Sequence, residues 1–402
     1  MDTILTNIVG LLIVAIAVAM AARRVKLPYT VGLVVTGAVL AGTRVVTGAF
    51  LTHDLITNLV LPPLLFEAAI NIGWRELRRD AAPILALAIF GTIGAALFAA
   101  AGMIFILGWP APSALLFGTL IAATDPVAVI AMFKDNNVHG RLRLLVESES
   151  LFNDGVAAVL FALVLVWAQS TDHSVIAPTE VIRLLLVTVV GGIAAGLLCA
   201  GVMTVLVGRT SDHLVESTLT TVTAYGSFLL AERFHASGVL ATVAAGLLSG
   251  NLGMLARHEG GQISDRGREF ALALWDFIAF IANSIVFLLI GLTVAEVSFQ
   301  RIGIGALGAI VILVLASRAI TVYPISWLFR RSRWAIPMMD RHVLWWGGLR
   351  GALGLALALS LPQSIDYRGE ILIATFAVVV FSVVIQGLTM PLLLRRRATI
   401  SG

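Results

Sequence analysis

Apolar residues fill long runs along this chain, and short polar segments separate the runs. We predict thirteen membrane-crossing helices, near residues 4–22, 29–48, 55–73, 81–108, 111–133, 144–168, 181–207, 214–232, 236–254, 270–295, 302–329, 342–361 and 369–394. A helix needs about 20 apolar residues to cross a bilayer and satisfies its own backbone hydrogen bonds there. The pattern predicts an all-α polytopic membrane protein in which residues 1–402 form a single transmembrane domain, without a soluble regulatory domain.

The composition excludes an ordinary soluble protein of this length. Of the 402 residues, 59% are hydrophobic and only 12% are charged, which is about half the charged fraction of a typical soluble domain. The single cysteine, Cys199, cannot form a disulfide within the chain. Arg23, Arg24 and Lys26 follow the first apolar run in place of a small-residue cleavage site, so we expect no cleavable signal peptide.

The positive charges alternate between the segments that connect the predicted spans. One set of alternate connections holds 20 of the 27 Lys and Arg residues, the opposite set holds five, and Arg318 and Arg350 lie within spans. Because Lys and Arg gather on the cytoplasmic side, we predict a cytoplasmic C-terminus and, with thirteen spans, an N-terminus outside. These charges are therefore interpreted as topology signals, and we expect no nucleic-acid partner.

A few ionisable side chains lie inside the predicted spans, where each costs about 2.5–3.5 kcal/mol to insert. The segment VESESLFNDGVAAVLF at 146–161 places Ser150 and Asp154 four residues apart, on one face of a helix. Asn153 lies about 100° from Asp154 around that helix, whereas Glu149 faces elsewhere. Oxygen ligands of these types suit a small hard cation such as Na⁺. An aspartate that binds either Na⁺ or H⁺ is the minimum chemistry for exchange.

The fifth predicted span contains an aspartate next to a proline, in AATDPVAVIAMFK at 122–134. Proline removes a backbone donor and disfavours a helical conformation of the preceding residue. We therefore expect Thr124, Asp125 and Pro126 to form an unwound segment. Irregular backbone at membrane depth occurs where it lines a cavity or is buried in protein, and freed carbonyl groups such as that of Thr124 can coordinate a cation.

A second break is predicted in WWGGLRGALG at 345–354, where glycines surround Arg350. Each glycine weakens a helix by about 1 kcal/mol relative to alanine. The glycines that we assign to the break are Gly347, Gly348 and Gly351.

The two breaks fall at equivalent places in two sets of six spans. They lie in spans 5 and 12, the fifth span of the first six and the fifth span of the last six. Paired interrupted helices are typical of transporters built from inverted repeats. The sequence therefore predicts inverted six-helix repeats at about 1–168 and 214–394, linked by the span at 181–207.

Several motifs resemble those of the monovalent cation:proton antiporter-1 family, which includes the NhaP-type sodium/proton antiporters of bacteria and archaea and the animal sodium/hydrogen exchangers. The resemblance covers nearly the whole chain, and the combination of ESLFND with TDPVAV is highly specific. The motifs are LPPLLFEAAI (61–70), ATDPVAV (123–129), ESLFNDGVAAVLF (149–161), AERFHASGVLA (231–241), FLLIG (287–291), SRA (317–319) and GGLRGALGLALAL (347–359).

The resemblance implies a site that binds a cation or a proton. Asp154 would carry either Na⁺ or H⁺ in a secondary transporter with alternating access. The other implied site residues are Asp125, Ser150, the backbone of Thr124, Asn153 and Glu67, with Na⁺ itself bound at Asp154, Asp125, Ser150 and Thr124. Asn153 stands where electrogenic relatives carry a second aspartate, so the resemblance implies an electroneutral 1:1 exchange.

The resemblance also implies charge partners and an architecture. Glu149 would pair with Arg318, and Arg350 would compensate helix ends and carboxylates around the two breaks. The fold would combine a core domain with a dimer-forming domain. The expected state is a homodimer in the lipid of a bacterial or archaeal plasma or inner membrane, where the exchange would serve pH homeostasis.

Other functions stay open at this stage. The residues do not separate Na⁺ from Li⁺ or K⁺, so a K⁺/H⁺ antiporter of the same fold is an alternative. An intramembrane aspartyl protease also needs two aspartates in spans, but its glycine-x-glycine-aspartate motif is absent at Asp154. An anion carrier would use Arg350, which the clustered carboxylates oppose. We therefore predict a transporter rather than an enzyme, with no cofactor besides the transported Na⁺ and H⁺.

Overall fold

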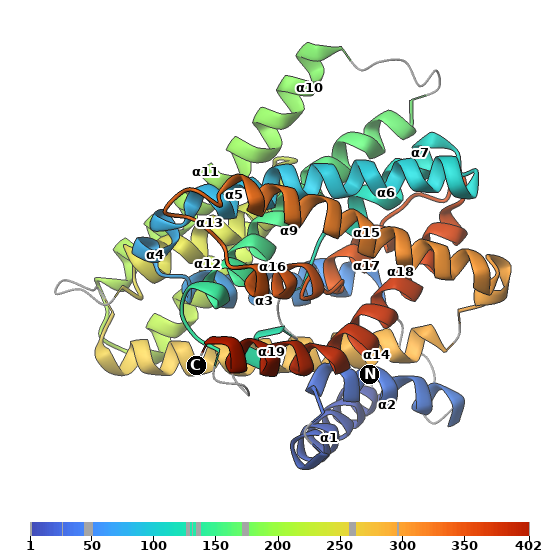
Figure 1. The fold of residues 1–402 in the computed structure, drawn as a ribbon. Helices are drawn as coiled ribbons and strands as arrows, with labels where there is room; N and C mark the ends of the chain where they lie inside the picture. Colours follow the sequence, from blue (N-terminus) through green and yellow to red (C-terminus); the bar gives the residue numbers. More distant parts are fainter. Residues whose placement is uncertain are drawn as a thin grey trace. The chain divides into compact units, whose positions relative to one another are not determined.

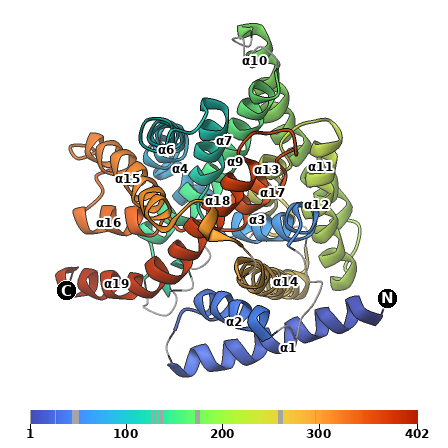
Figure 2. The ribbon, with the colours of Figure 1, turned by 90° about the vertical axis from the view of Figure 1, so that its right-hand side faces the viewer.

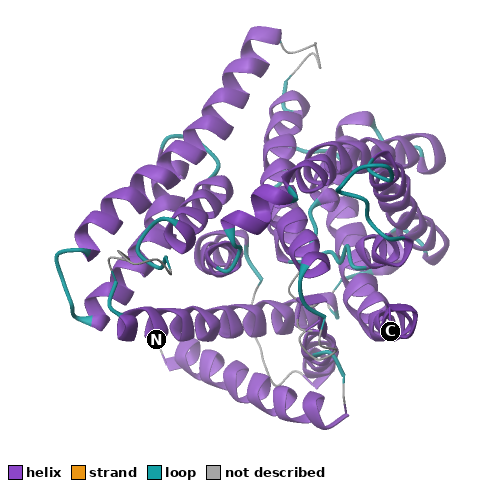
Figure 3. Cartoon of the chain, turned by 60° about the vertical axis from the view of Figure 1, so that its left-hand side comes forward, coloured by secondary structure: helices purple, strands orange, loops and turns teal. Residues whose placement is uncertain are grey.

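Helices make up all of the regular secondary structure in the part of the chain that the computed structural model describes (Figure 3). The described residues are 2–25, 27–43, 51–125, 129–130, 132–133, 138–170, 177–256, 263–295 and 297–401, with side chains described except at 2–8, 23, 43 and 398–401. The all-helical class predicted from the apolar runs is therefore confirmed for these residues.

The helices, which are labelled along the chain in Figure 1, belong to two compact units, and the chain passes between them more than once. The first unit contains Met1–Ile56, Ala82–Thr171 and Asn283–Gly402, and the second contains Thr57–Ala81 and Asp172–Ala282. The predicted inverted repeats and the predicted linker span stay predictions.

The first unit holds both segments that were expected to be interrupted. Its helices are α1 (Asp2–Val25), α2 (Tyr29–Thr43), α5 (Ala81–Leu85), η2 (Ala86–Gly91), α6 (Thr92–Leu107), α7 (Ala111–Ala122), α9 (Arg141–Ala168), the last part of α14 (Asp265–Val294), η4 (Phe299–Arg301), α15 (Ile304–Leu328), α16 (Met338–Trp346), α17 (Ala352–Leu359), α18 (Arg368–Phe381), η5 (Ser382–Gln386) and α19 (Gly387–Ser401).

The second unit holds the segment that carries Glu67. Its helices are η1 (Leu55–Val60), α3 (Leu61–Ile70), α4 (Trp74–Arg79), α10 (Pro178–Leu185), η3 (Leu186–Gly191), α11 (Gly192–Val207), α12 (His213–Arg233), α13 (Gly238–Asn251) and the first part of α14.

Several helices have the length and the apolar composition of membrane spans. Among the described residues, six are long and apolar enough to cross a bilayer, at Ala81–Leu107, Arg141–Ala168, Pro178–Val207, Asp265–Val294, Ile304–Leu328 and Arg368–Arg397, and shorter apolar helices accompany them. Large apolar side chains on these helices are exposed, as at Phe105 and Ile312, which is expected of surfaces that face lipid. The chain is thus a multi-pass membrane protein, while the count of thirteen spans stays a prediction.

A hydrophobic core fills the first unit around α7. Phe117 and Leu120 of α7 are fully buried against residues of α6, α15 and α18, including Met103, Leu313 and Val378. Gly118 allows α7 to approach α6 closely, because a Cβ atom at this position would overlap the carbonyl oxygen of Ala96. Small residues at such contacts allow the tight packing that holds membrane helices together.

The second unit has its own core. Phe66 of α3 and Trp275 of α14 are fully buried, with ring centroids 4.7 Å apart. The indole nitrogen of Trp275 donates to Thr220 Oγ1 of α12 at 2.9 Å, so the polar end of this large side chain is satisfied in the apolar interior.

Two helices of the first unit stop within the apolar interior. Helix α7 ends at Ala122, and residues 123–125 are not helical. Helix α16 ends at Trp346 and α17 begins at Ala352, with non-helical backbone at Gly348–Gly351. The span predicted near 111–133 was expected to unwind at Thr124 and Asp125, and both residues are non-helical. Pro126, which we assigned to the first break, lies outside the described residues.

Candidate functional site

The two interrupted segments contact each other through their backbones. The N–H of Asp125 donates to the carbonyl of Leu349 at 2.7 Å. Arg350 Nη1 donates to the carbonyl of Ala123 at 3.1 Å and also to that of Ile121. Carbonyl groups at the C-terminal end of a helix lack partners within the helix and carry partial negative charge. The buried guanidinium of Arg350 therefore satisfies the end of α7.

The second break is also held from its other side by η5, a π-helical turn within the α18–α19 segment. The backbone N–H of Arg350 donates to Ser382 Oγ at 3.1 Å. Gln386 Nε2 donates to the carbonyl of Trp346 at 2.9 Å. A π-helical turn often marks a functional position in a helix, and here its polar side chains bind Trp346 and Arg350, which lie on either side of Gly347 and Gly348.

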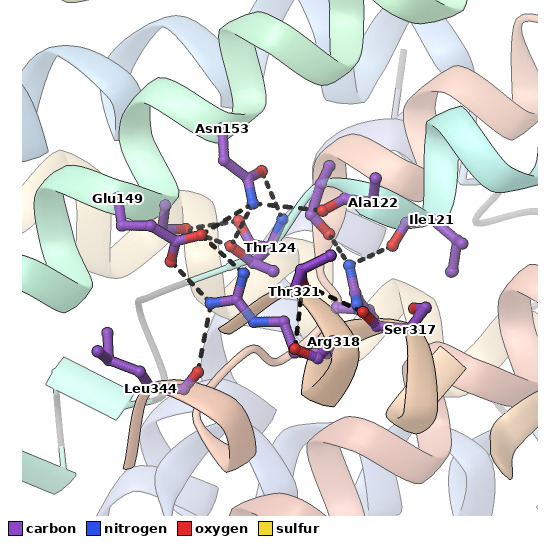
Figure 4. Close-up of polar contacts among 12 residues, drawn as sticks. Ile121, Ala122, Thr124, Glu149, Asn153, Ser317, Arg318, Thr321 and Leu344 are labelled. Carbon is purple, nitrogen blue, oxygen red and sulfur yellow. Dashed lines mark hydrogen bonds and ion pairs between the residues drawn. The ribbon is translucent and has the colours of Figure 1, made fainter. Parts of the chain in front are cut away.

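Side chains of α9 hold the first break through Thr124 (Figure 4). Ser150 Oγ donates to the Thr124 carbonyl at 2.7 Å and accepts from Thr124 Oγ1 at 3.1 Å. The Thr124 N–H donates to Asn153 Oδ1 at 3.1 Å, and Asn153 Nδ2 donates to Thr124 Oγ1 at 3.1 Å. The backbone N–H and carbonyl of Thr124 are thus satisfied by side chains of α9.

Asp154 follows these residues on α9 and is 8% exposed. Its Oδ1 atom is buried and accepts no hydrogen bond from any described residue. Asp125 and Glu149 both interact with Asp154 electrostatically. A buried carboxylate oxygen without a partner costs free energy unless it binds a proton or a cation, and Asp154 Oδ1 is such an oxygen.

Glu149 faces Arg318 of α15, as Figure 4 shows. The guanidinium donates in fork geometry, with Nη1–Oε1 at 2.7 Å and Nη2–Oε2 at 2.8 Å, and Nη2 also donates to the carbonyl of Leu344 at 3.3 Å. Both side chains are buried. This arrangement is the strong, bidentate form of a carboxylate–arginine pair, and it connects α9 with α15.

The buried charges of this unit do not balance by themselves. Among its described residues, the buried charged side chains are Glu149, Asp154, Arg318 and Arg350, and Asp125 adds a partly buried carboxylate. With all five ionised, three negative charges meet two positive charges. One monovalent cation or one proton makes the group neutral, which removes the cost of an unpaired charge in a low dielectric.

Two glycines of the second break leave room for charged side chains. A Cβ atom on Gly351 would overlap Asp125, with the Asp125 Cγ only 2.6 Å away. A Cβ atom on Gly348 would lie 2.7 Å from Arg318 Nε. These glycines were predicted only as helix breakers, because the sequence does not show which side chains lie against them.

The structure brings most of the predicted site residues together in the first unit, and one of them belongs to the second unit. Thr124, Asp125, Ser150, Asn153 and Asp154 lie in the first unit, linked by the contacts above. Glu67 belongs to the second unit, where its backbone carbonyl and Oε1 accept from Asn71 Nδ2 at 2.9 and 2.8 Å. Its membership of the site therefore stays a prediction.

Sequence reasoning missed Ser382 and Gln386. Both stand in the last apolar run, where isolated polar residues are rare enough to be a usable signal. Each binds a backbone group of the second break, as described above.

Comparisons with known proteins give a consistent result. Residues 9–396 match the family described as sodium/hydrogen exchanger, transmembrane. The Na⁺/H⁺ antiporter ApNhaP of Aphanothece halophytica is 40% identical over 378 residues, which are 92% of this chain and 70% of that protein. The Na⁺/H⁺ antiporter NhaH of Halobacillus aidingensis is 31% identical over 401 residues, 97% of each chain.

A solved structure shares the fold. The sodium proton antiporter MjNhaP1 of Methanocaldococcus jannaschii at pH 8 superposes with a TM-score of 0.73 and 20% sequence identity, over 98% of this chain and 99% of that chain. A score of this size shows that the two chains have the same arrangement of helices.

Proposed function

This chain belongs to the transmembrane sodium/hydrogen exchanger family, and on that premise we propose that it exchanges Na⁺ for H⁺ across the membrane. The relatives that cover most of its length carry the name Na⁺/H⁺ antiporter. The observation that carries the proposal is the buried, unpartnered Oδ1 of Asp154 beside two interrupted helices. Such a carboxylate can hold one proton or contribute to the coordination of one cation, and it cannot do both at once.

The proposed Na⁺ ligands are Asp154, Asp125, Ser150 and the Thr124 carbonyl. The Thr124 carbonyl accepts one hydrogen bond from Ser150 and has a second lone pair available. Ser150 Oγ likewise has one lone pair left, because it accepts a single hydrogen bond from the described residues, that of Thr124 Oγ1. These are hard oxygen ligands of the kind that alkali cations prefer, and the interrupted helix provides the carbonyl at membrane depth.

The charge balance supports an electroneutral 1:1 exchange. The buried group carries one excess negative charge when Asp154 is ionised and empty, and it is neutral with either one Na⁺ or one H⁺. Moving the empty site through a low-dielectric region is costly, whereas both loaded forms move without net charge. This difference in cost couples Na⁺ transport to H⁺ transport, because only a site that holds one of the two ions moves readily across the membrane.

We propose further that the transport cycle uses alternating access in a homodimer in the bacterial or archaeal plasma membrane. The alternation of Lys and Arg along the sequence supports a cytoplasmic C-terminus and an N-terminus outside. Glu67 of the second unit is proposed as a further member of the site, and Arg350 as the charge that stabilises the end of α7.

The experiment that tests this function is proton movement in proteoliposomes. A pH gradient is imposed, Na⁺, Li⁺ or K⁺ is added in turn, and internal pH is followed by a fluorescent dye. We expect Na⁺ to trigger proton movement in the wild type, and a membrane potential alone, set with valinomycin, to trigger none. Asp154→Asn should reduce the Na⁺ response to the level of empty liposomes, because its amide cannot exchange a proton.

A matched control comes from the same unit. Asp366 is exposed, and Asp366→Asn removes a carboxylate of the same type outside the site, so its antiport should equal that of the wild type. A full Na⁺ response in folded Asp154→Asn would contradict the proposed carrier. A response to K⁺ with none to Na⁺ would replace the proposed substrate with a K⁺/H⁺ exchange on the same site.

A further inference from the structure

An arginine patch lies on the first unit, away from the site described above. It is formed by Arg330, Arg331, Arg333, Arg341, Arg395 and Arg396. Of these, all except Arg341 are exposed. The first four stand in and just after the loop between α15 and α16, and the last two stand on α19. These three helices lie together on one side of the unit in Figure 2.

The α15–α16 loop of the patch is held in a defined conformation. Arg141, in the first turn of α9, donates to the carbonyls of Trp334 and Ala335 at 2.9 and 2.7 Å. Arg341 Nε donates to the carbonyl of Ile336 at 2.9 Å. Because the backbone is fixed from both sides, the exposed arginines of the loop are presented by a fixed scaffold.

Contacts of α19 place its basic C-terminal end beside the α15–α16 loop. Arg397 Nε donates to Asp340 Oδ1 at 2.6 Å, and Asp340 lies in the first turn of α16, which the loop precedes. Trp346 Nε1 donates to Thr389 Oγ1 at 2.8 Å, further along the same pair of helices. Arg395 and Arg396 thus belong to the surface formed by the loop, and Asp340 is already paired with Arg397.

Two of the loop arginines stack on tryptophan rings. The guanidinium carbon of Arg330 lies 3.9 Å from the centroid of the Trp327 ring, and that of Arg333 lies 4.6 Å from the Trp334 ring. Trp327 and Leu328 beside them are exposed, at 51% and 76%. Stacking orders an arginine side chain without using its hydrogen-bond donors, so both guanidinium groups can still bind an oxygen anion.

The patch lies where membrane-spanning helices meet one membrane surface. The apolar span α15 ends at Leu328, the span of α18 and α19 extends to Arg397, and the span of α9 begins at Arg141. Exposed tryptophan beside exposed leucine is typical of the level where lipid headgroups meet the hydrocarbon. Basic side chains at this level extend their charged ends toward the headgroups.

From these observations we propose that the patch binds the headgroup of an anionic phospholipid. The guanidinium forks match phosphate oxygens, and the net positive charge complements a negative headgroup. The apolar flank of Trp327 and Leu328 fits the adjoining acyl chain. This surface is separate from the ion site, so the proposal stands independently of Na⁺/H⁺ exchange.

The test is lipid binding to the full-length protein by native mass spectrometry. The wild type is titrated with phosphatidylglycerol and, separately, with phosphatidylcholine of the same acyl chains. We expect a preference for phosphatidylglycerol that falls about fivefold for each arginine removed, and therefore by about a hundredfold in R330Q/R331Q/R333Q. The pair R395Q/R396Q gives a second, independent test on α19 if the triple variant does not fold.

The control variant is R75Q/R78Q, which removes two exposed arginines of α4 outside the patch and should keep the preference. Equal affinity of the wild type for the two lipids would overturn the proposal. So would an unchanged preference in both patch variants, since the arginines would then only set membrane orientation. Displacement of bound phosphatidylglycerol by a short polyglutamate peptide would identify the surface as a site for an acidic protein segment instead.

Discussion

Asp154 has the one carboxylate oxygen of the described cluster that is buried without a hydrogen-bond donor. Three polar neighbours on α9 are engaged, since Ser150 and Asn153 bind the backbone of Thr124 and Glu149 binds Arg318. The residues around Asp154 therefore act as a fixed frame. We therefore propose that Asp154, whose Oδ1 has no partner, is the group that exchanges Na⁺ for H⁺.

Gly351 provides a residue-level test of this frame, because it leaves the space that Asp125 fills. In Gly351→Ala the added Cβ would lie 2.6 Å from Asp125 Cγ, so either the carboxylate or the break must move. Overpacking of this kind costs about 1–3 kcal/mol. We expect the apparent KM for Na⁺ to rise by about tenfold with a smaller change in maximal rate, as measured by Na⁺-triggered proton movement in proteoliposomes.

Gly369→Ala is the matched control, since a Cβ at Gly369 meets nothing within 4 Å and the residue stands in the first turn of α18. This variant should keep the wild-type KM. A wild-type KM in folded Gly351→Ala as well would show that Asp125 does not depend on Gly351 for its position. A loss of rate at unchanged KM would place the effect in the movement of the break rather than in cation binding.

At the residue scale, local spacing predicted which residues of α9 belong to the site. It did not predict which residues from distant parts of the chain contact the two breaks. Ser150 and Asp154 share a helical face by their separation alone, and a proline after Asp125 is sufficient reason to expect a break. The contact between Gly351 and Asp125 joins positions more than 200 residues apart along the chain, and no local pattern encodes it. The same holds for Ser382 and the backbone of Arg350.

At the scale of elements, the Glu149–Arg318 pair ties α9 to α15 inside the apolar interior. Removing one partner leaves the other charge buried and uncompensated, which costs about 3–5 kcal/mol. We expect Glu149→Gln and Arg318→Gln each to lower the melting temperature of the purified protein strongly. The double variant E149Q/R318Q should be more stable than either single variant, because it leaves no unpaired charge.

The comparison of the three variants shows whether Glu149 and Arg318 form only a structural ion pair or also take part in transport. Melting is followed by intrinsic fluorescence in one detergent, and antiport is measured in parallel. Recovery of both stability and Na⁺-triggered proton movement in the double variant fits a structural tie between two helices. Additive losses of stability would contradict the coupling, and a stable double variant without antiport would give Glu149 or Arg318 a direct part in transport.

The apolar pattern predicts where helices lie more reliably than how each one is built. Long runs such as 144–168 and 302–329 correspond closely to α9 and α15. The run at 369–394 is instead divided by a π-helical turn at Ser382–Gln386, which changes the direction of the side chains after it. Such turns depend on tertiary contacts, here with the second break, and hydrophobicity alone does not reveal them.

At the scale of the whole molecule, the family and the helical class follow from motifs and composition. Electroneutral exchange depends instead on how many charges share one buried environment. The motifs suggest this number through Asn153, and the contacts support it by pairing Glu149 with Arg318 and directing Arg350 to backbone carbonyls. On this count a single excess negative charge is left, and we propose that one Na⁺ or one H⁺ compensates it.

The dependence of the apparent Na⁺ affinity on pH tests this central claim most directly. Initial rates of Na⁺-triggered proton movement are measured in proteoliposomes over a range of Na⁺ concentrations, with the same pH on the side of Na⁺ addition throughout each series. Because Na⁺ needs the deprotonated carboxylate, we expect the apparent KM to rise as pH falls, approaching about tenfold per pH unit on the acidic side, with an unchanged maximal rate at saturating Na⁺. An apparent KM that does not change with pH would mean that Na⁺ and H⁺ do not share the site at Asp154.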